Sequence, residues 1–200
     1  MVAVRNAERT RERILQTTFE LMYRHGYQGM RIEQILLATD LAKGALYHHF
    51  SNKQKLGYAV VDEVLFGAMQ RKWVDPLSNT STPLITLQSI LDQSYQNITQ
   101  QEMELGCPLN NLSQEMSGLD DGFQQRLEHI YNMWSDSLTD ALTLGQQNGQ
   151  VKKDLDPKVV AIFIISSLQG ITGAAKCMQD IEMLKQLKDM LNDYIGSLSV

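Results

Sequence analysis

The segment from Lys43 to Lys53, KGALYHHFSNK, concentrates cations, imidazole rings, a tyrosine and a glycine in one short stretch. Lysine, histidine and tyrosine side chains are donors suited to phosphate oxygens and base edges. Leu46 and Phe50 are four residues apart, so a helix places both on one inward face and turns the polar residues outward. Gly44 costs about 1 kcal/mol in helix propensity, yet it leaves backbone amides bare enough to approach a phosphate. The segment is therefore predicted to be a short helix whose exposed face contacts nucleic acid.

A longer helix and a second short helix are needed to position this segment. Apolar residues recur near helical spacing from about residue 8 to residue 25, and Gly26 is predicted to end that helix as its C-cap. A short helix is predicted at 31–38, and residues 39–41, which have turn-type chemistry, separate it from another at 42–49. Two short helices joined by a tight turn form the helix-turn-helix pattern, whose second helix lies in the major groove of DNA.

The rest of the chain is predicted to be helical as well, so the fold class is all-α. Only 4 of the 200 residues are prolines, 43% are hydrophobic, and no run alternates strictly between apolar and polar residues. A long helix is expected to start near Ser51 or Lys53, with Ser51 or Asn52 as its cap, and to continue to about residue 72. The segment 74–83 holds two prolines and is the clearest break in composition. Further helices are predicted at 84–104, 107–117, 121–148, 156–178 and 181–198.

Charge is divided unevenly along the chain. Residues 1–75 carry 11 Lys and Arg against 8 Asp and Glu, whereas residues 76–200 carry 7 against 15, which together give the formal charge of −5. Binding to nucleic acid depends on the local electrostatic field over a patch of surface. The net positive charge of residues 1–75 is therefore more informative about nucleic-acid binding than the net negative charge of the whole chain.

Cysteine use and hydropathy favour a cytoplasmic protein. Cys107 and Cys177 are far apart and follow no secretory leader, so neither a disulfide framework nor a CxxC metal site is expected. The longest apolar run, residues 159–168, is too short to span a bilayer and is predicted to be a buried helix.

Catalytic and metal-binding chemistry have little support in the sequence. It contains no phosphate-cradling glycine loop, HExxH motif or GxSxG elbow, so no enzyme activity and no cofactor are expected. His48 and His49 are adjacent and point about 100° apart on a helix, so they cannot jointly bind zinc, and no metal site is expected. Cys107 follows a glycine at the start of a predicted helix. A thiolate there could sense oxidants or electrophiles, and a small buried hydrophobic residue is the alternative.

Residues 14–56, ILQTTFELMYRHGYQGMRIEQILLATDLAKGALYHHFSNKQKL, resemble the DNA-binding domain of the TetR family of bacterial transcription regulators, most specifically in KGALYHHFSNKQKL. The segments GCPLNNLSQEMS at 106–117 and LQGITGAAK within 156–178 are similar to a common C-terminal subclass of that family. The resemblance implies a helix-turn-helix DNA-binding domain at 1–52 and a larger helical ligand-binding and dimerisation domain at 53–200. It also implies DNA contacts from the third helix, and a phosphate contact from the lysine that starts the next helix. These residues are Lys43, Gly44, Ala45, Tyr47, His48, His49 and Lys53.

The chain departs from the family pattern at three places. Met30 and Arg31 stand where many members have the Thr or Ser that caps the second helix, so Arg31 is expected to supply a charged DNA contact instead. Asp40 and Leu41 replace the usual Gly-Val of the turn, which is tolerable because aspartate can adopt a left-handed conformation. Ala42 removes a hydroxyl that usually precedes the lysine.

The expected function is that of a DNA-binding transcriptional regulator, a homodimeric repressor that leaves a palindromic operator when a small-molecule inducer binds. One recognition helix buries too little surface for tight specific binding, so two copies are needed. The dimer face is expected on the last two helices, at Ile164, Leu168, Ile171, Leu184, Leu187 and Leu191. The inducer is expected among residues of the middle helices, at Tyr95, Met103, Cys107, Met116, Phe123, Tyr131 and Trp134.

Each of these assignments has an alternative. The apolar stripe of the last two helices and the methionine and aromatic residues could be plain core, and Tyr47 and His49 could be half-buried packing residues. For the whole chain, the alternative is an all-α small-molecule carrier or stress module that does not bind DNA.

Overall fold

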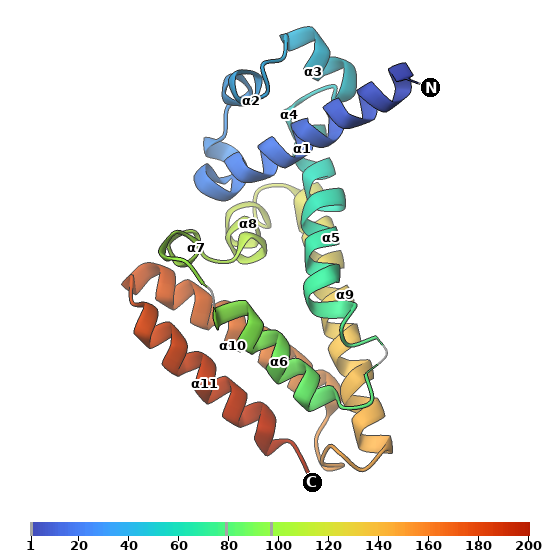
Figure 1. Cartoon of the computed structure of the whole chain (residues 1–200), viewed down its shortest axis with the longest axis vertical. Helices are drawn as coiled ribbons and strands as arrows, with labels where there is room; N and C mark the ends of the chain where they lie inside the picture. Colours follow the sequence, from blue (N-terminus) through green and yellow to red (C-terminus); the bar gives the residue numbers. More distant parts are fainter. Residues whose placement is uncertain (1, 79, 97) are drawn as a thin grey trace. The chain divides into compact units, whose positions relative to one another are not determined.

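The computed structural model describes residues 2–78, 80–96 and 98–200, with side chains from residue 6 onward (Figure 1). Within these ranges the regular elements are helices, apart from an isolated antiparallel bridge between Val151 and Ser199. The all-α prediction is confirmed. In chain order the elements are α1 (Val2–Gly29), α2 (Ile32–Thr39), α3 (Lys43–His49), α4 (Lys53–Ala59), the π-helical turn η1 (Val60–Leu65), α5 (Phe66–Met69), the π-helical turn η2 (Gln70–Val74), α6 (Pro83–Gln96), α7 (Gln100–Leu105), α8 (Pro108–Met116), α9 (Asp121–Gln147), α10 (Pro157–Met178) and α11 (Ile181–Ser197).

The helical run from Lys53 to Val74 begins where the sequence predicts. Asn52 Oδ1 accepts a hydrogen bond from Lys55 N at 2.8 Å, so Asn52 rather than Ser51 is the N-cap. The run is continuous but not uniform, because α4 and α5 alternate with η1 and η2.

One predicted helix is wrong, because residues 84–104 form two helices. α6 ends at Gln96 and α7 begins at Gln100. Thr99 caps α7, since its Oγ1 accepts from Glu102 N at 3.2 Å while Glu102 Oε2 accepts from Thr99 N at 2.8 Å. This reciprocal capping starts a new helix that the spacing of apolar residues does not reveal.

The chain divides into two compact units, each built from two separate parts of the sequence. Unit 1 contains the residues up to Ala68 together with Asn111–Glu128, and unit 2 contains Met69–Asn110 and His129–Val200. These units differ from the division predicted after residue 52, because α4, η1 and part of the segment Asn111–Glu128 contact α1. The predicted limits of an independently folding DNA-binding domain stay a prediction.

The core of unit 1 takes one side of each of its first four helices. Ile14 of α1, Ile35 of α2, Leu46 of α3 and Leu56 of α4 have no exposed surface, and Phe50 is only 5% exposed. The predicted inward face of the third helix, Leu46 and Phe50, is confirmed.

In unit 2, α10 and α11 lie side by side, and α11 also contacts α6 (Figure 1). Ile164 of α10 and Ile195 of α11 are fully buried. Asp92 of α6 accepts hydrogen bonds from Lys188 Nζ at 3.0 Å and from Asn192 Nδ2 at 2.8 Å. Apolar and polar contacts together therefore fix α6 against α11.

Candidate nucleic-acid interface

Helix α3 presents a polar face on the surface of unit 1. Leu46 anchors one side of the helix in the core, while Lys43, Gly44 and His48 are exposed. Tyr47 keeps 37% of its surface exposed, so its ring and hydroxyl are available to a partner. The exposed residues of α3 point away from the core, as the sequence predicts.

Aromatic and cationic groups lie close together on this face. Lys43 Nζ is 5.9 Å from the centroid of the Tyr47 ring, and the rings of His48 and His49 are 5.6 Å apart, edge to face. Ala45 and His49 are half-buried, so the packing alternative is better supported for His49 than for Tyr47. The face offers ammonium, hydroxyl and imidazole donors, which are groups that contact phosphates and base edges.

Gly44 is not required by the packing of unit 1. A Cβ atom added at Gly44 would meet no described atom within 4 Å, and the backbone there has no positive φ. Glycine inside a helix costs about 1 kcal/mol relative to alanine. No close contact with the described residues calls for glycine at this position, and the open space over the backbone fits the close approach of a partner such as DNA.

The turn before α3 depends on Asp40. This residue has left-handed backbone angles, φ 49° and ψ 44°, as predicted. Leu41 N donates to Leu36 O at 3.2 Å, and Thr39 Oγ1 donates to Ile35 O at 2.6 Å, which closes the end of α2. Aspartate tolerates this conformation, so its replacement of glycine preserves the turn.

Arg31 is the N-cap residue of α2 and is exposed. Its backbone N–H donates to Gln34 Oε1 at 2.8 Å, so the helix begins with a side-chain contact even though the usual Thr or Ser is missing. The DNA contact of the Arg31 side chain stays a prediction.

Lys53 has a role that the sequence does not reveal. Its Nζ donates to Met30 O at 2.6 Å and to Gln28 O at 3.3 Å, and it lies 4.8 Å from the centroid of the Tyr27 ring. Burial lowers the pKa of Lys53, while the negative charge of Glu115 opposes that shift. The ammonium holds the backbone between α1 and α2. The phosphate contact predicted for Lys53 stays a prediction, and this geometry does not favour it.

The break in α1 at Gly26 is held by a carboxylate from a distant helix. Gly26 has φ 74° and ψ 165°, which leaves the N–H groups of Tyr27 and Gln28 at the start of a new turn. Glu115 of α8 accepts both, through Oε2 from Tyr27 N at 2.9 Å and through Oε1 from Gln28 N at 2.8 Å. A Cβ at Gly26 would lie 2.9 Å from both carboxylate oxygens. Glu115 therefore acts as an N-cap supplied by another helix, and it fixes the turn that leads into α2.

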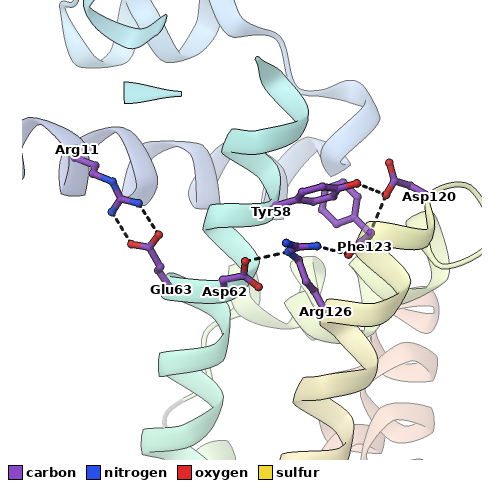
Figure 2. A network of polar contacts seen from close by, with 8 residues as sticks. Arg11, Tyr58, Asp62, Glu63, Asp120, Phe123 and Arg126 are labelled. Atoms are coloured by element: carbon purple, nitrogen blue, oxygen red, sulfur yellow. Dashed lines mark hydrogen bonds and ion pairs between the residues drawn. The ribbon is translucent and has the colours of Figure 1, made fainter. Parts of the chain in front are cut away.

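Figure 2 shows a polar network that ties the helical run after α3 to α1 and α9. Arg11 pairs with Glu63 through two hydrogen bonds of 2.6 Å, and this contact lowers the pKa of Glu63. Arg126 Nε donates to Asp62 Oδ2 at 2.9 Å. All four side chains are partly exposed, so each pair contributes at most about 1 kcal/mol, and their effect is to fix geometry.

Asp120 is the centre of the second part of this network (Figure 2). Its Oδ1 accepts from Tyr58 OH at 2.6 Å and from Phe123 N at 3.0 Å, and its Oδ2 accepts from Gln54 Nε2 at 2.7 Å. The hydrogen bond from Tyr58, and then that from Gln54, lowers the pKa of Asp120. Tyr58 and Asp120 are 62 residues apart, so no local pattern could have predicted their contact.

Two family models match separate parts of the chain. Residues 14–60 match the model of bacterial regulatory proteins of the tetR family, and residues 83–191, more than half of the chain, match the tetracyclin repressor-like C-terminal domain. The chain belongs to the TetR family. It is a helix-turn-helix transcriptional regulator, as the sequence predicts.

Two relatives that are named HTH-type transcriptional regulators agree with this assignment. An HTH-type transcriptional regulator in the lacX 3' region of Lactococcus lactis is 32% identical over 188 residues, which is 94% of each chain. The transcriptional repressor DhaR of Mycobacterium sp. strain GP1 is 29% identical over 177 residues, which is 88% of this chain and 87% of DhaR.

Solved structures of the TetR family share the fold. A TetR transcriptional regulator from Chloroflexus aurantiacus has a TM-score of 0.85 at 24% identity, with 98% of each chain covered. Reduced NemR from E. coli has a TM-score of 0.81 at 21% identity, with 96% of this chain and 97% of NemR covered.

The residues predicted to bind the inducer do not all lie in one unit. Met116 and Phe123 belong to unit 1, where the Phe123 ring lies 4.5 Å from that of Tyr27 and 5.0 Å from that of Tyr58. Phe123 is fully buried and belongs to the core of unit 1. The other five belong to unit 2, namely Tyr95, Met103, Cys107, Tyr131 and Trp134.

The predicted dimer residues need a correction. Four of them are at most 5% exposed, namely Ile164, Leu168, Leu184 and Leu191. These side chains form the core of unit 2, so they have no surface to offer to a partner. Ile171 and Leu187 are half-buried. The spacing of apolar residues had identified the buried faces of α10 and α11 and not the exposed ones.

Replacing Gly44 by alanine is expected to stabilise α3 and to weaken DNA binding at the same time. The added Cβ removes a helix cost of up to about 1 kcal/mol, but it fills the open space where DNA is predicted to approach the backbone. Thermal unfolding should shift upward while the Kd for DNA, measured by fluorescence anisotropy, rises. Gly118→Ala is the control, since its Cβ also meets nothing within 4 Å and Gly118 lies outside α3. Unaltered affinity in Gly44→Ala would show that DNA does not approach this backbone.

Removing the Glu115 carboxylate is expected to loosen the turn at Gly26. In Glu115→Ala the N–H groups of Tyr27 and Gln28 lose their acceptor, so the free energy of unfolding should fall by about 1–2 kcal/mol. Hydrogen exchange should become faster at these two amides. Glu128→Ala, which removes an exposed carboxylate from the same unit, should leave that exchange unchanged. Equal protection of both amides in Glu115→Ala and in the wild type would contradict the role of Glu115.

Proposed function

We propose that the protein is a homodimeric repressor that binds an operator through α3 and leaves it when a small molecule binds unit 2. The observation that carries DNA binding is the exposed polar face of α3, with open space over Gly44. Repression is supported by relatives that are named repressors, such as DhaR. A regulator that acts on bacterial DNA is expected to work in the cytoplasm.

A second copy is proposed to bind at the exposed face of α10. Val159, Ile162 and Phe163 are 63%, 48% and 50% exposed, and the Phe163 ring lies 4.8 Å from that of Tyr194 on α11. Among the described helices, α10 is also the one long and apolar enough to cross a membrane, with a mean hydropathy of 1.5. A partner copy that covers this face accounts for its apolar surface, and a second α3 supplies the DNA contact area that one lacks.

The small-molecule site is proposed within unit 2, around Tyr95, Met103 and Trp134. All three are at most 9% exposed, and Trp134 Nε1 has no hydrogen-bond partner among the described residues. Because buried donors are normally satisfied, an acceptor on a bound molecule fits this position. Such a molecule releases DNA only if it binds more tightly to a dimer state in which the distance between the two α3 helices does not match the spacing of the operator half-sites.

A gel shift with the DNA upstream of the protein's own coding region tests the proposal. A shifted band that specific competitor DNA removes, and non-specific DNA does not, is the expected result. If the purified protein binds no DNA duplex of any sequence at low salt, the result would favour the alternative of an all-α carrier without DNA binding.

Lys43→Ala is expected to weaken binding to all DNA sequences and to flatten its salt dependence. Each phosphate contact contributes about −0.9 to the slope of log K against log salt, and the Lys43 side chain is exposed. Lys53→Ala is the matched variant. It should lower stability and leave the slope nearly unchanged, since its Nζ already donates to Met30 O and Gln28 O. DNA-binding titrations at several NaCl concentrations measure this slope. An unchanged slope in Lys43→Ala would reject the phosphate contact of Lys43.

Phe163→Glu is expected to produce a monomer that binds DNA weakly. A carboxylate on the exposed face of α10 would have to be desolvated in a dimer, which is unfavourable. Sedimentation or light scattering gives the mass, and anisotropy gives the DNA affinity. Leu144→Glu, at another exposed apolar residue of unit 2, should remain dimeric. A dimeric Phe163→Glu protein would place the interface elsewhere.

A further inference from the structure

A groove with a volume of about 630 Å³ opens on unit 2 between η2 and one face of α6. Its first wall contains Arg71, Lys72 and Pro76. Its second wall consists of α6 residues, namely Ile85, Thr86, Ser89, Ile90, Gln93 and Ser94. Small-molecule sites in proteins commonly have volumes of about 300–1,000 Å³, so the groove is large enough for a ligand.

The groove uses a face of α6 that does not pack on the last two helices. Gln88 Nε2 donates to Asn192 O of α11 at 3.0 Å, and Tyr95 OH lies 3.3 Å from Thr172 Oγ1 of α10. Ser89 and Gln93, in contrast, are exposed and line the groove. The groove shares no lining residue with the region around Tyr95, Met103 and Trp134 where the inducer is proposed to bind. The two lie near each other, because Lys72 Nζ is 5.2 Å from the Trp73 ring and that ring is 4.8 Å from the ring of Trp134.

The groove is cationic although unit 2 is acidic. Its lining contains Arg71 and Lys72, and no aspartate or glutamate is among the described residues that form it. Unit 2 as a whole carries 8 Lys and Arg against 12 Asp and Glu. The positive charge is a local property of the groove, and a concave site of one sign concentrates ligands of the opposite charge.

Lys72 is accessible and desolvated at the same time. The residue is exposed to solvent and lines the groove, yet burial by the surrounding protein lowers the pKa of its ammonium, while Cys107 and Glu102 oppose this shift. An anion that pairs with such a group replaces part of its lost hydration.

The α6 wall supplies a hydroxyl donor and an apolar surface. Gln93 Nε2 donates to Ser89 Oγ at 3.1 Å, so the Ser89 O–H can itself donate to a bound anion. Ser94 Oγ donates to Ile90 O at 2.7 Å and is therefore engaged within the helix. Ile85, which is 66% exposed, adds aliphatic surface, and Ile90 lines the groove with the 7% of its surface that is exposed.

We propose that this groove binds an amphipathic organic monoanion, such as a carboxylate with an aliphatic chain. The carboxylate lies between Arg71 and Lys72, and the chain lies along Ile85 and Ile90. Charge-assisted hydrogen bonds from guanidinium and ammonium groups are strong contacts for a carboxylate. The isoleucines distinguish this ligand from an inorganic anion. The groove belongs to unit 2 alone, so the proposal does not depend on DNA binding.

Tryptophan emission can follow binding directly. The 2 tryptophans of the chain, Trp73 and Trp134, have ring centroids 4.8 Å apart, and Lys72 Nζ lies 5.2 Å from the centroid of the Trp73 ring. Octanoate should change the emission in a saturable way. Octylammonium, which has the same chain and the opposite charge, should not bind, and inorganic phosphate should bind about tenfold more weakly because it lacks the chain.

Two variants and a matched control locate the site. Arg71→Met and Lys72→Met should each weaken octanoate binding by about tenfold, the effect of one charge-assisted hydrogen bond, with Kd measured by calorimetry. Lys153→Met removes an exposed charge from unit 2 outside the groove and should retain the wild-type Kd. Thermal unfolding and gel shifts of the same proteins show that they are folded and separate this test from that of DNA binding.

Three results would overturn the proposal. Octanoate affinity that is unchanged in both Arg71→Met and Lys72→Met would place the carboxylate elsewhere. Equal binding of octylammonium would show an apolar surface without charge selection, and equal binding of phosphate would show an anion site without an apolar part. The absence of saturable octanoate binding to the wild-type protein would remove the site altogether.

Discussion

The burial of Leu46 in unit 1 is the contact on which the DNA-binding surface depends. A helix of 7 residues such as α3 is not stable in water by itself, because the conformational entropy lost in helix nucleation outweighs the stabilisation from so few backbone hydrogen bonds. Leu46 has no exposed surface, and Phe50 closes the end of α3 with Arg11 stacked 5.2 Å from its ring centroid. Tertiary packing therefore makes the helix, and the same packing turns Lys43 and Tyr47 outward.

The junction between α1 and α2 is held by two opposite charges. The turn after Gly26 leaves N–H groups that need an acceptor and carbonyl groups that need a donor. Glu115 supplies the acceptor for Tyr27 and Gln28, and Lys53 supplies the donor for the carbonyls of Gln28 and Met30. A carboxylate and an ammonium together satisfy the backbone at the point where the chain enters the helix-turn-helix.

Helix α10 shows why an apolar pattern does not by itself assign a surface. Ile164 and Leu168 face the core of unit 2, while Val159, Ile162 and Phe163 remain exposed on the same helix. A helix that is apolar on more than one side needs more than one partner surface. The inner side is covered by the chain itself, and the outer one is the face proposed to bind a second copy.

The sequence by itself determined the helical class, the breaks at Gly26 and Asp40 and the short α3 with its polar outer face, because these features depend on residue types and spacing within a few turns. The tertiary structure decided that Lys53 is bound to backbone carbonyls, whereas Lys43 is exposed. It also decided which side of α10 remains open, with Phe163 on it. These outcomes depend on groups that are distant in the sequence, and the spacing of residues within one helix does not encode which distant group will satisfy a charge or cover a face.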